Sequence, residues 1–209
     1  MPDRPTLALL GVTAIWGSTF VVVKDAVQRM PVTDFLTWRF ALAALAMIVL
    51  RPRAVARLGS RGRRVGMVLG LALGAALGAG YLLQTLGLQT TSAAVSGFVT
   101  GMFVVLTPLG AALLLREPPG RAAWAAVALA TVGLGLLSLH GLTVGSGELL
   151  TLGCAAAFAL HIVGLGRHAS SYDAFGLAVV QLLTVAGLSA VVAVPGGLAT
   201  PPDAGVWGA

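Results

Sequence analysis

Charged residues are scarce in this sequence of 209 amino acids. Asp, Glu, Lys and Arg together make up 10% of it, against about 25% in soluble globular proteins. Hydrophobic residues make up 57% and the mean hydropathy is +0.95, which is more apolar material than a small domain can bury. A soluble single-domain fold is therefore excluded. The composition predicts an all-α, polytopic helix bundle whose solvent is mostly lipid, with charges confined to the helix ends.

Recognisable catalytic and metal-binding motifs are also lacking. The single cysteine, Cys154, lies in an apolar run and can form neither an intramolecular disulfide nor a zinc cluster. The sequence has no Gly-x4-Gly-Lys-Ser/Thr nucleotide-binding loop, no paired carboxylates and no His-Glu-x-x-His segment. We therefore expect no enzyme activity, no cofactor and no metal site.

Basic residues outnumber acidic ones by 13 to 7, a balance that suggests a nucleic-acid partner in a soluble protein. Here six arginines lie between residues 51 and 64, in the connection between two apolar segments. Because Lys and Arg gather on the cytoplasmic side of membrane proteins, we interpret them as a topology signal and expect no nucleic-acid binding.

Charged residues divide the sequence into apolar segments that are long enough to cross a bilayer, since about 20 helical residues span ~30 Å. The uncharged stretch 65–115 is too long for one crossing and predicts a helical hairpin that turns near residues 89–93. We predict seven crossings, at residues 5–23, 32–50, two within 65–115, 122–139, 149–166 and 174–194.

The distribution of basic residues between the predicted loops sets the orientation. With the N-terminus inside, the inner regions hold ten Lys or Arg and the outer ones three, as the positive-inside rule requires. We predict a multi-pass protein of the cell inner (plasma) membrane with a cytoplasmic N-terminus. The first segment is expected to stay in the mature chain, because no clear cleavage pattern follows it.

Glycine recurs at every fourth position of the third predicted helix, at Gly66, Gly70, Gly74 and Gly78. This spacing stacks the four glycines on one face and allows another helix to approach closely. We interpret the face as a packing seam, and helix sliding during a transport cycle is the alternative.

A weak internal repeat relates the first and sixth predicted helices. Residues 10–16 can be aligned with residues 152–158, and in this alignment a Gly, an Ala and an aromatic residue occupy matching positions. Five helices separate the two starts, and an odd number inverts the second copy in the membrane. Inverted repeats are typical of transporters.

Several short motifs resemble one known family. They are Ile-Trp-Gly-Ser-Thr-Phe at 15–20 followed by Lys24, Gly-Leu-Gln-Thr-Thr-Ser-Ala at 87–93, Thr-Pro-Leu at 107–109, Arg-Glu-Pro at 116–118 and Gly-Glu-Leu-Leu at 147–150. Together they resemble the EamA-type transporters of the drug/metabolite transporter superfamily.

This resemblance implies ten helices in two inverted five-helix repeats, with both termini cytoplasmic and alternating access around a central cavity. Residues 1–140 would form the first repeat and residues 147–209 the incomplete start of the second. The chain would then contain seven of ten helices, and we expect it to be truncated at its C-terminus.

The first predicted helix carries a polar and aromatic stripe, because Trp16, Phe20 and Lys24 lie four residues apart. Trp16 lies too deep for an interfacial aromatic belt, so cavity lining is favoured for it. A lysine that snorkels to the interface is the simpler interpretation of Lys24. Ser18, beside Gly17, would permit a kink or close approach of a ligand.

Later helices supply the remaining candidates for a substrate cavity: Tyr81, Gln84, Thr100 and His161. Gln84 needs a polar partner in lipid, which another helix or a substrate could provide. His161 could relay protons or contact substrate, or it could be a neutral, hydrogen-bonded packing residue. A kink is expected at Pro108, which lacks a backbone N–H.

Arg39 is a charge inside the second predicted helix, close in sequence to Asp34. A charge at such a depth requires compensation. An ion pair with Asp34 is the first interpretation and contact with a substrate is the second.

The predicted function is secondary active transport, by alternating access, that exports small metabolites or drugs across the cytoplasmic membrane. The alternative is a structural or inactive membrane fragment that lacks the last three helices. The expected partners are a small-molecule substrate and the lipid bilayer, and a homodimer is left open.

Overall fold

The computed structural model describes residues 4–53, 63–116, 120–138 and 145–208, and every regular element in these ranges is helical. The α-helices are α1 (Arg4–Arg29), α2 (Val32–Leu50), α3 (Arg63–Thr90), α4 (Ala93–Gly101), α5 (Phe103–Leu115), α6 (Arg121–Ser138), α7 (Ser146–His168), α8 (Ala174–Ala193) and the short α9 (Ala204–Trp207). Two 3₁₀ turns, Ala169–Ser171 and Val194–Gly196, follow α7 and α8.

These helices confirm the predicted all-α, polytopic bundle. Six of them, with α4 and α5 taken as one, are long and apolar enough to cross a membrane, and α6 contains a shorter apolar helix. The hairpin turn lies between α3 and α4 as predicted. The middle of the arginine-rich loop (54–62), positions 117–118 of the Arg-Glu-Pro motif and the predicted helix end at 139 lie outside the described residues.

One boundary was predicted wrongly, because α1 continues past Lys24 to Arg29. Charges at a membrane surface do not end a helix, and Asp25 pairs with Arg29 one turn later. The helix ends where Pro31 follows Met30, since the residue before a proline is pushed out of the helical region.

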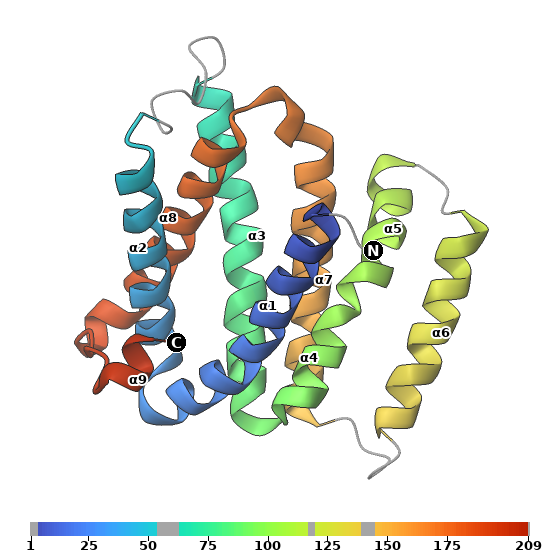
Figure 1. The fold of residues 1–209 in the computed structure, drawn as a ribbon, viewed down its shortest axis with the longest axis horizontal. Helices are drawn as coiled ribbons and strands as arrows, with labels where there is room; N and C mark the ends of the chain where they lie inside the picture. The colour runs from blue at the N-terminus through green and yellow to red at the C-terminus, as the bar shows by residue number, and fades with distance from the viewer. Residues whose placement is uncertain (1–3, 54–62, 117–119, 139–144, 209) are drawn as a thin grey trace.

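The central helix of the bundle is α3, which packs along α7 on one side and α8 on another (Figure 1). Helix α2 packs mainly against α8, so these two helices lie together on one side of α3. Helix α1 crosses in front of α3, and α6 stands at the opposite edge of the molecule beside α4 and α5 (Figure 1).

The glycine face of α3 lies against α8. A Cβ atom built at Gly70 would lie 2.6 Å from Cγ1 of Val180, and one at Gly74 would lie 2.6 Å from Cβ of Thr184. At Gly78 the nearest atom, in Val185, would be 3.5 Å away. Gly66, one turn earlier, is buried. The two backbones therefore approach more closely here than any larger residue would allow.

A second set of glycines brings α3 against α7. A Cβ atom at Gly80 would collide with the ring of Phe158. Near the end of α3, a Cβ at Gly87 would lie 2.7 Å from the carbonyl oxygen of Gly147, at the start of α7. Glycines on two faces of α3 therefore fix both of its main neighbours.

The span formed by α4 and α5 is interrupted at Met102. The N–H of Met102 donates to the carbonyl of Val99, three residues back, at 3.1 Å, so the chain tightens for one turn. Pro108, where the sequence predicts a kink, lies inside α5, and the helix continues past it to Leu115. The interruption lies nearer the N-terminus, directly after Gly101, where the backbone has least resistance to bending.

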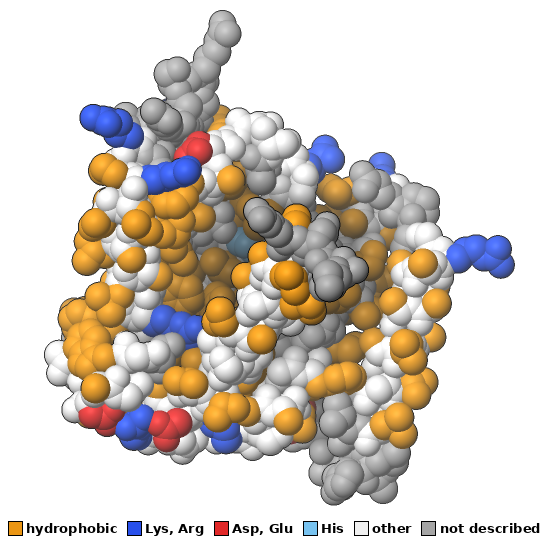
Figure 2. All heavy atoms as spheres, viewed as in Figure 1, with side chains coloured by type: hydrophobic (Ala, Val, Ile, Leu, Met, Phe, Trp, Pro, Cys, Tyr) orange, Lys and Arg blue, Asp and Glu red, His pale blue; other side chains and the backbone are white. Residues whose placement is uncertain are grey.

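Charged side chains gather mainly at the two ends of the helices, and the faces between them are largely apolar (Figure 2). One end carries the arginines at the end of α2, the start of α3, the end of α5, the start of α6 and the end of α7: Arg51, Arg53, Arg64, Arg116, Arg121 and Arg167. This is the end that the positive-inside rule predicts to be cytoplasmic.

We expect Gly74→Leu to destabilise the bundle by about 2–3 kcal/mol, because its side chain would have to enter the backbone contact with α8. Thermal unfolding in detergent measures the effect. Gly187→Leu is the matched control, since Gly187 is exposed on α8 and has open space around it. Equal melting temperatures for the two variants would contradict the packing role of the seam.

Candidate functional site

A cavity of about 160 Å³ lies where α1, α3, α5 and α7 meet. Its lining is mostly aromatic and carries few polar groups. The residues that line it are Trp16, Leu77, Tyr81, Phe103, Phe158, His161 and Ile162. Three of them, Trp16, Tyr81 and His161, are among the candidates named from the sequence, and the structure brings these three together from different helices.

The aromatic side chains around this cavity form a continuous series. Neighbouring ring centroids lie 4.8–6.4 Å apart in tilted or edge-to-face arrangements, which are the favoured geometries for aromatic pairs. In order of contact the series is Phe20, Trp16, Phe103, Phe158, Tyr81 and Phe40. Phe20 is thus placed behind Trp16, as a support for it.

His161 is fixed in the cavity wall by a hydrogen bond to α3. Its Nδ1 lies 3.0 Å from the carbonyl oxygen of Leu73. A carbonyl can only accept, so Nδ1 must carry the hydrogen, and in the neutral ring Nε2 is left as an acceptor. His161 therefore offers one hydrogen-bond acceptor on a wall that is otherwise mostly aromatic and apolar, with the side chains of Tyr81 and Trp16 as its other polar members.

Gln84 and Thr100 are not among the residues that line this cavity, and they bind each other. Nε2 of Gln84 donates to Oγ1 of Thr100 at 3.1 Å, and both residues are buried between α3 and α4. One turn before Thr100, the fully buried Ser96 hydroxyl has no hydrogen-bond partner among the described residues. Ser18 is exposed, and its hydroxyl donates to the carbonyl of Ile15 in its own helix.

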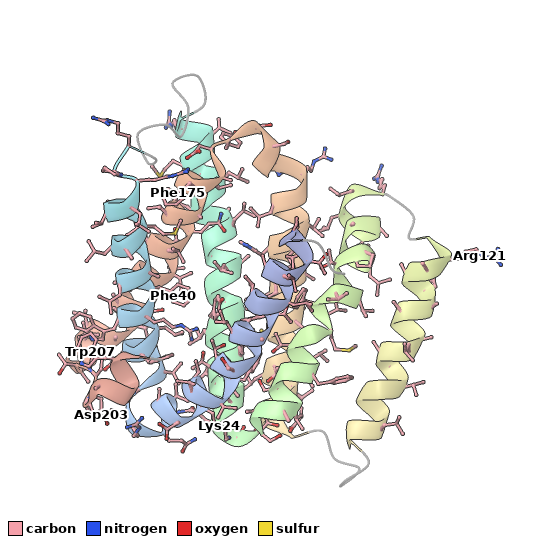
Figure 3. The ribbon with its side chains drawn as sticks, viewed as in Figure 1. Lys24, Phe40, Arg121, Phe175, Asp203 and Trp207 are labelled. Carbon is pink, nitrogen blue, oxygen red and sulfur yellow. The ribbon has the colours of Figure 1, made fainter. Side chains whose placement is uncertain are left out.

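Lys24 joins three of the sequence motifs in a polar junction, which consists of Lys24, Leu88, Thr91 and Glu148. Nζ of Lys24 donates to the carbonyl oxygens of Leu88 at 2.8 Å and Thr91 at 2.6 Å. These carbonyls are among those that the end of α3 leaves unsatisfied. The Thr91 hydroxyl donates to the carboxylate of Glu148 at the start of α7. The junction thus ties α1, α3 and α7 together at the end of the bundle where Lys24 lies (Figure 3).

Arg39 does not pair with Asp34. Both ion pairs among the described residues involve Arg29, which binds Asp25 and Asp203. Asp34 accepts hydrogen bonds from the backbone N–H of Ala199 and from the Thr33 hydroxyl. Arg39 lies instead over the ring of Phe35, with 5.7 Å between Cζ and the ring centroid.

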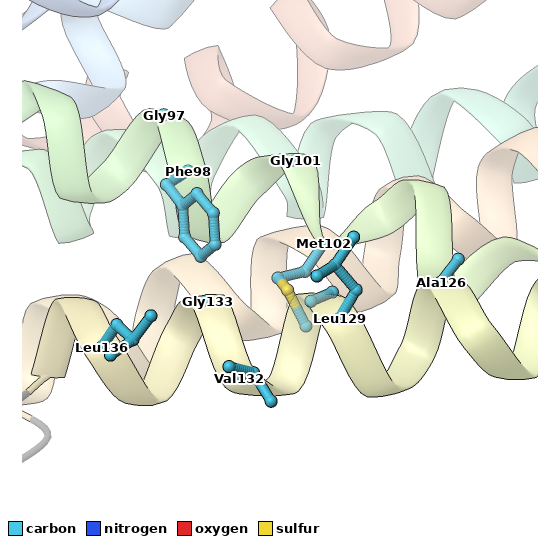
Figure 4. A pocket seen from close by; sticks show the side chains of 10 residues that line it. Gly97, Phe98, Gly101, Met102, Ala126, Leu129, Val132, Gly133 and Leu136 are labelled. Carbon is cyan, nitrogen blue, oxygen red and sulfur yellow. The ribbon is translucent and has the colours of Figure 1, made fainter.

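The largest of the cavities described here, about 520 Å³, lies between α4 and α6 (Figure 4). Its walls are built from glycine, alanine and apolar side chains such as Phe98, Met102 and Leu129. A site that selects a solute needs a few placed polar groups. The described residues of its lining include no polar side chain, so its size alone does not make it the better candidate.

Phe103 and Phe158 are cavity residues that the sequence reasoning missed. A signal for Phe158 was present, because the internal alignment of 10–16 with 152–158 places Phe158 opposite Trp16. In the structure both rings contact Phe103. Helix α7 also runs opposite to α1 (Figure 1), which an inverted repeat requires, while the repeat itself stays a prediction.

Comparison with known proteins identifies the family. The EamA-like transporter family matches residues 4–139, well over half of the chain. The chain belongs to this family. The match confirms the resemblance carried by the short motifs, and together with the apolar helices it shows that this EamA-like chain is a multi-pass membrane protein.

One curated relative of this EamA-like chain is a protein of Archaeoglobus fulgidus described as an uncharacterized transporter. It is 33% identical over 189 residues, which cover 90% of this chain and 57% of the relative. The chain therefore spans little more than half of the relative's length. No solved structure matches the chain.

Replacing Lys24 with Met should destabilise the protein by about 2 kcal/mol, because two backbone carbonyls at the end of α3 would lose a charged donor. Chemical unfolding in mild detergent, followed by circular dichroism, gives the difference. The control is Gln28→Met, one turn further along α1, where the exposed amide makes only a 3.4 Å contact. A Lys24 variant as stable as the control would show that the junction contributes nothing.

Proposed function

We propose that this EamA-like protein is a secondary active transporter that exports small metabolites or drugs across the cytoplasmic membrane by alternating access. The observation that carries the proposal is the aromatic cavity. It lies between helices of residues 1–140 (α1, α3 and α5) and the first helix after residue 146 (α7). In transporters built from repeats, the solute site lies at the interface between the repeats.

The lining of the cavity favours a solute with a flat, apolar body and one hydrogen-bond donor. Aromatic side chains offer faces and edges on which such a body can stack. Nε2 of His161 is the acceptor for the donor group. Small-molecule sites typically combine an apolar wall with a few polar groups of this kind.

The interruption of the helix at Met102 supports the proposal that the segment beside the cavity moves during transport. Phe103 is the first residue of α5 after the break, and it contacts both Trp16 and Phe158. Broken helices commonly form the solute sites of transporters. A change of angle between α4 and α5 would shift the Phe103 ring between α1 and α7.

A structural or inactive membrane fragment is the alternative, since the chain spans 57% of its relative. Flux in proteoliposomes separates the two. The 209-residue chain is compared with a version extended by three C-terminal helices, with amino acids, purine-like metabolites and cationic dyes as trial solutes. Flux above that of protein-free liposomes supports transport, and its absence from both versions for every trial solute favours the structural role.

Trp16→Ala should lower solute flux about tenfold while insertion into the membrane stays normal, because the cavity loses one aromatic wall. The comparison variant is Trp124→Ala, which removes an exposed tryptophan from α6. Initial rates of uptake are measured at equal protein density. Unchanged flux in the Trp16 variant would place this side chain in plain packing.

A further inference from the structure

A second cavity, of about 130 Å³, lies between α2 and the segment that ends in α9. Arg39 is its only charged lining residue, and Phe35, Trp38 and Trp207 supply aromatic walls. The two tryptophan rings meet edge to face, with 5.6 Å between their centroids. A single cation thus faces a small space with apolar walls.

The guanidinium group of Arg39 has unused binding capacity. Among the described residues it forms no ion pair and no hydrogen bond, and its one close partner is the Phe35 ring. The nearby carboxylates are engaged elsewhere, Asp34 by the N–H of Ala199 and Asp203 by Arg29. A charge held within a membrane-crossing helix is costly unless an anion compensates it.

Specific hydrogen bonds hold the far wall of this cavity in place. Both backbone groups of Ala199 form hydrogen bonds to α2. Its N–H donates to the carboxylate of Asp34, and its carbonyl accepts from Nε1 of Trp38 at 3.0 Å. Further along, Asp203 accepts from the N–H groups of Gly205 and Val206 at the start of α9 and from Arg29. The bond from Val206, with the charge of Arg29, holds the pKa of Asp203 below its usual range, so it stays ionised at neutral pH.

We propose that this cavity binds a small monocarboxylate, whose two oxygens pair with the guanidinium group of Arg39 while its alkyl part lies against Trp38 and Trp207. The planar fork of arginine matches a carboxylate with two parallel hydrogen bonds. A dianion is disfavoured because the lining offers one positive charge. The volume equals about four water molecules of ~30 Å³ each, which suits a ligand of four to six heavy atoms.

The proposal also bears on the transported solute. Phe40, the residue after Arg39 in α2, packs against Tyr81 with 4.8 Å between the ring centroids, and Tyr81 lines the aromatic cavity. As a statement about which solutes are carried, the inference rests on the proposed function. Binding of a monocarboxylate in this cavity does not depend on the proposed function, so binding and transport can be tested separately.

The test uses the 209-residue chain in phosphatidylcholine nanodiscs at pH 7.5. Sodium butyrate is titrated while tryptophan emission is recorded, since Trp38 and Trp207 lie in the cavity wall. Butyramide, which is neutral and of equal size, is the control ligand. We expect saturable quenching by butyrate, with butyramide binding at least tenfold more weakly. Equal binding of the two ligands would overturn the proposal.

Variants assign the binding to Arg39. Arg39→Gln should weaken butyrate binding tenfold or more, and Arg39→Lys should weaken it less, because the charge remains while the paired bonds are lost. Arg121→Gln, at the opposite edge of the molecule from Trp207 (Figure 3), should bind as the unchanged chain does. Thermal unfolding in the same nanodiscs checks folding. Wild-type affinity in a folded Arg39→Gln or Arg39→Lys variant would contradict the assignment.

A lipid phosphate is a second source of a singly charged anion for Arg39. The titration is therefore repeated in nanodiscs of phosphatidylglycerol. Unchanged butyrate affinity there supports a soluble ligand, whereas loss of binding would assign the site to lipid and overturn the proposal. Butyrate binding without any flux in proteoliposomes would contradict the transport proposal and leave this site intact.

Discussion

The close approach of α3 to α7 and α8 is the contact on which the rest of the structure depends. In lipid, apolar side chains gain nothing by leaving their solvent, so helices associate through close packing and a few polar bonds. Glycines on two faces of α3 provide that closeness. The same contact builds the aromatic cavity, because Phe158 lies against Gly80 and the carbonyl that fixes His161 belongs to Leu73, next to Gly74.

Helices α1 and α7 occupy unequal environments. In α7, 39% of the apolar stretch is buried, because α3 packs along it, whereas the value for α1 is 11%. The predicted repeat makes Trp16 and Phe158 equivalent positions. Of the helices that form the aromatic cavity, α1 is therefore a more exposed wall than α7.

The sequence alone predicts those features of the fold that depend on the spacing of charged residues along the chain. The bounds of α2, the turn between α3 and α4 and the all-helical bundle follow from where charges and prolines stand along the chain. The cavity was only partly predictable, since Phe103 joins it through the contact of α5 with α7, which no local pattern reveals. The Asp34–Arg39 pairing failed on helix geometry, because five residues at 3.6 per turn place two side chains about 140° apart.

The polar groups inside the bundle are of two kinds. Some form the hydrogen bonds that hold the helices together, and others keep donors or acceptors that no described residue uses. Gln84 and Thr100 satisfy each other, and Lys24 satisfies the end of α3. Since lipid offers no hydrogen bonds, such pairing is the condition for assembly. The acceptor of His161 and the donors of Arg39 are not needed for it, and each faces a cavity with aromatic walls. Within a membrane such unpaired polar groups cost stability, so the acceptor of His161 and the donors of Arg39 are binding capacity that assembly of the bundle does not use.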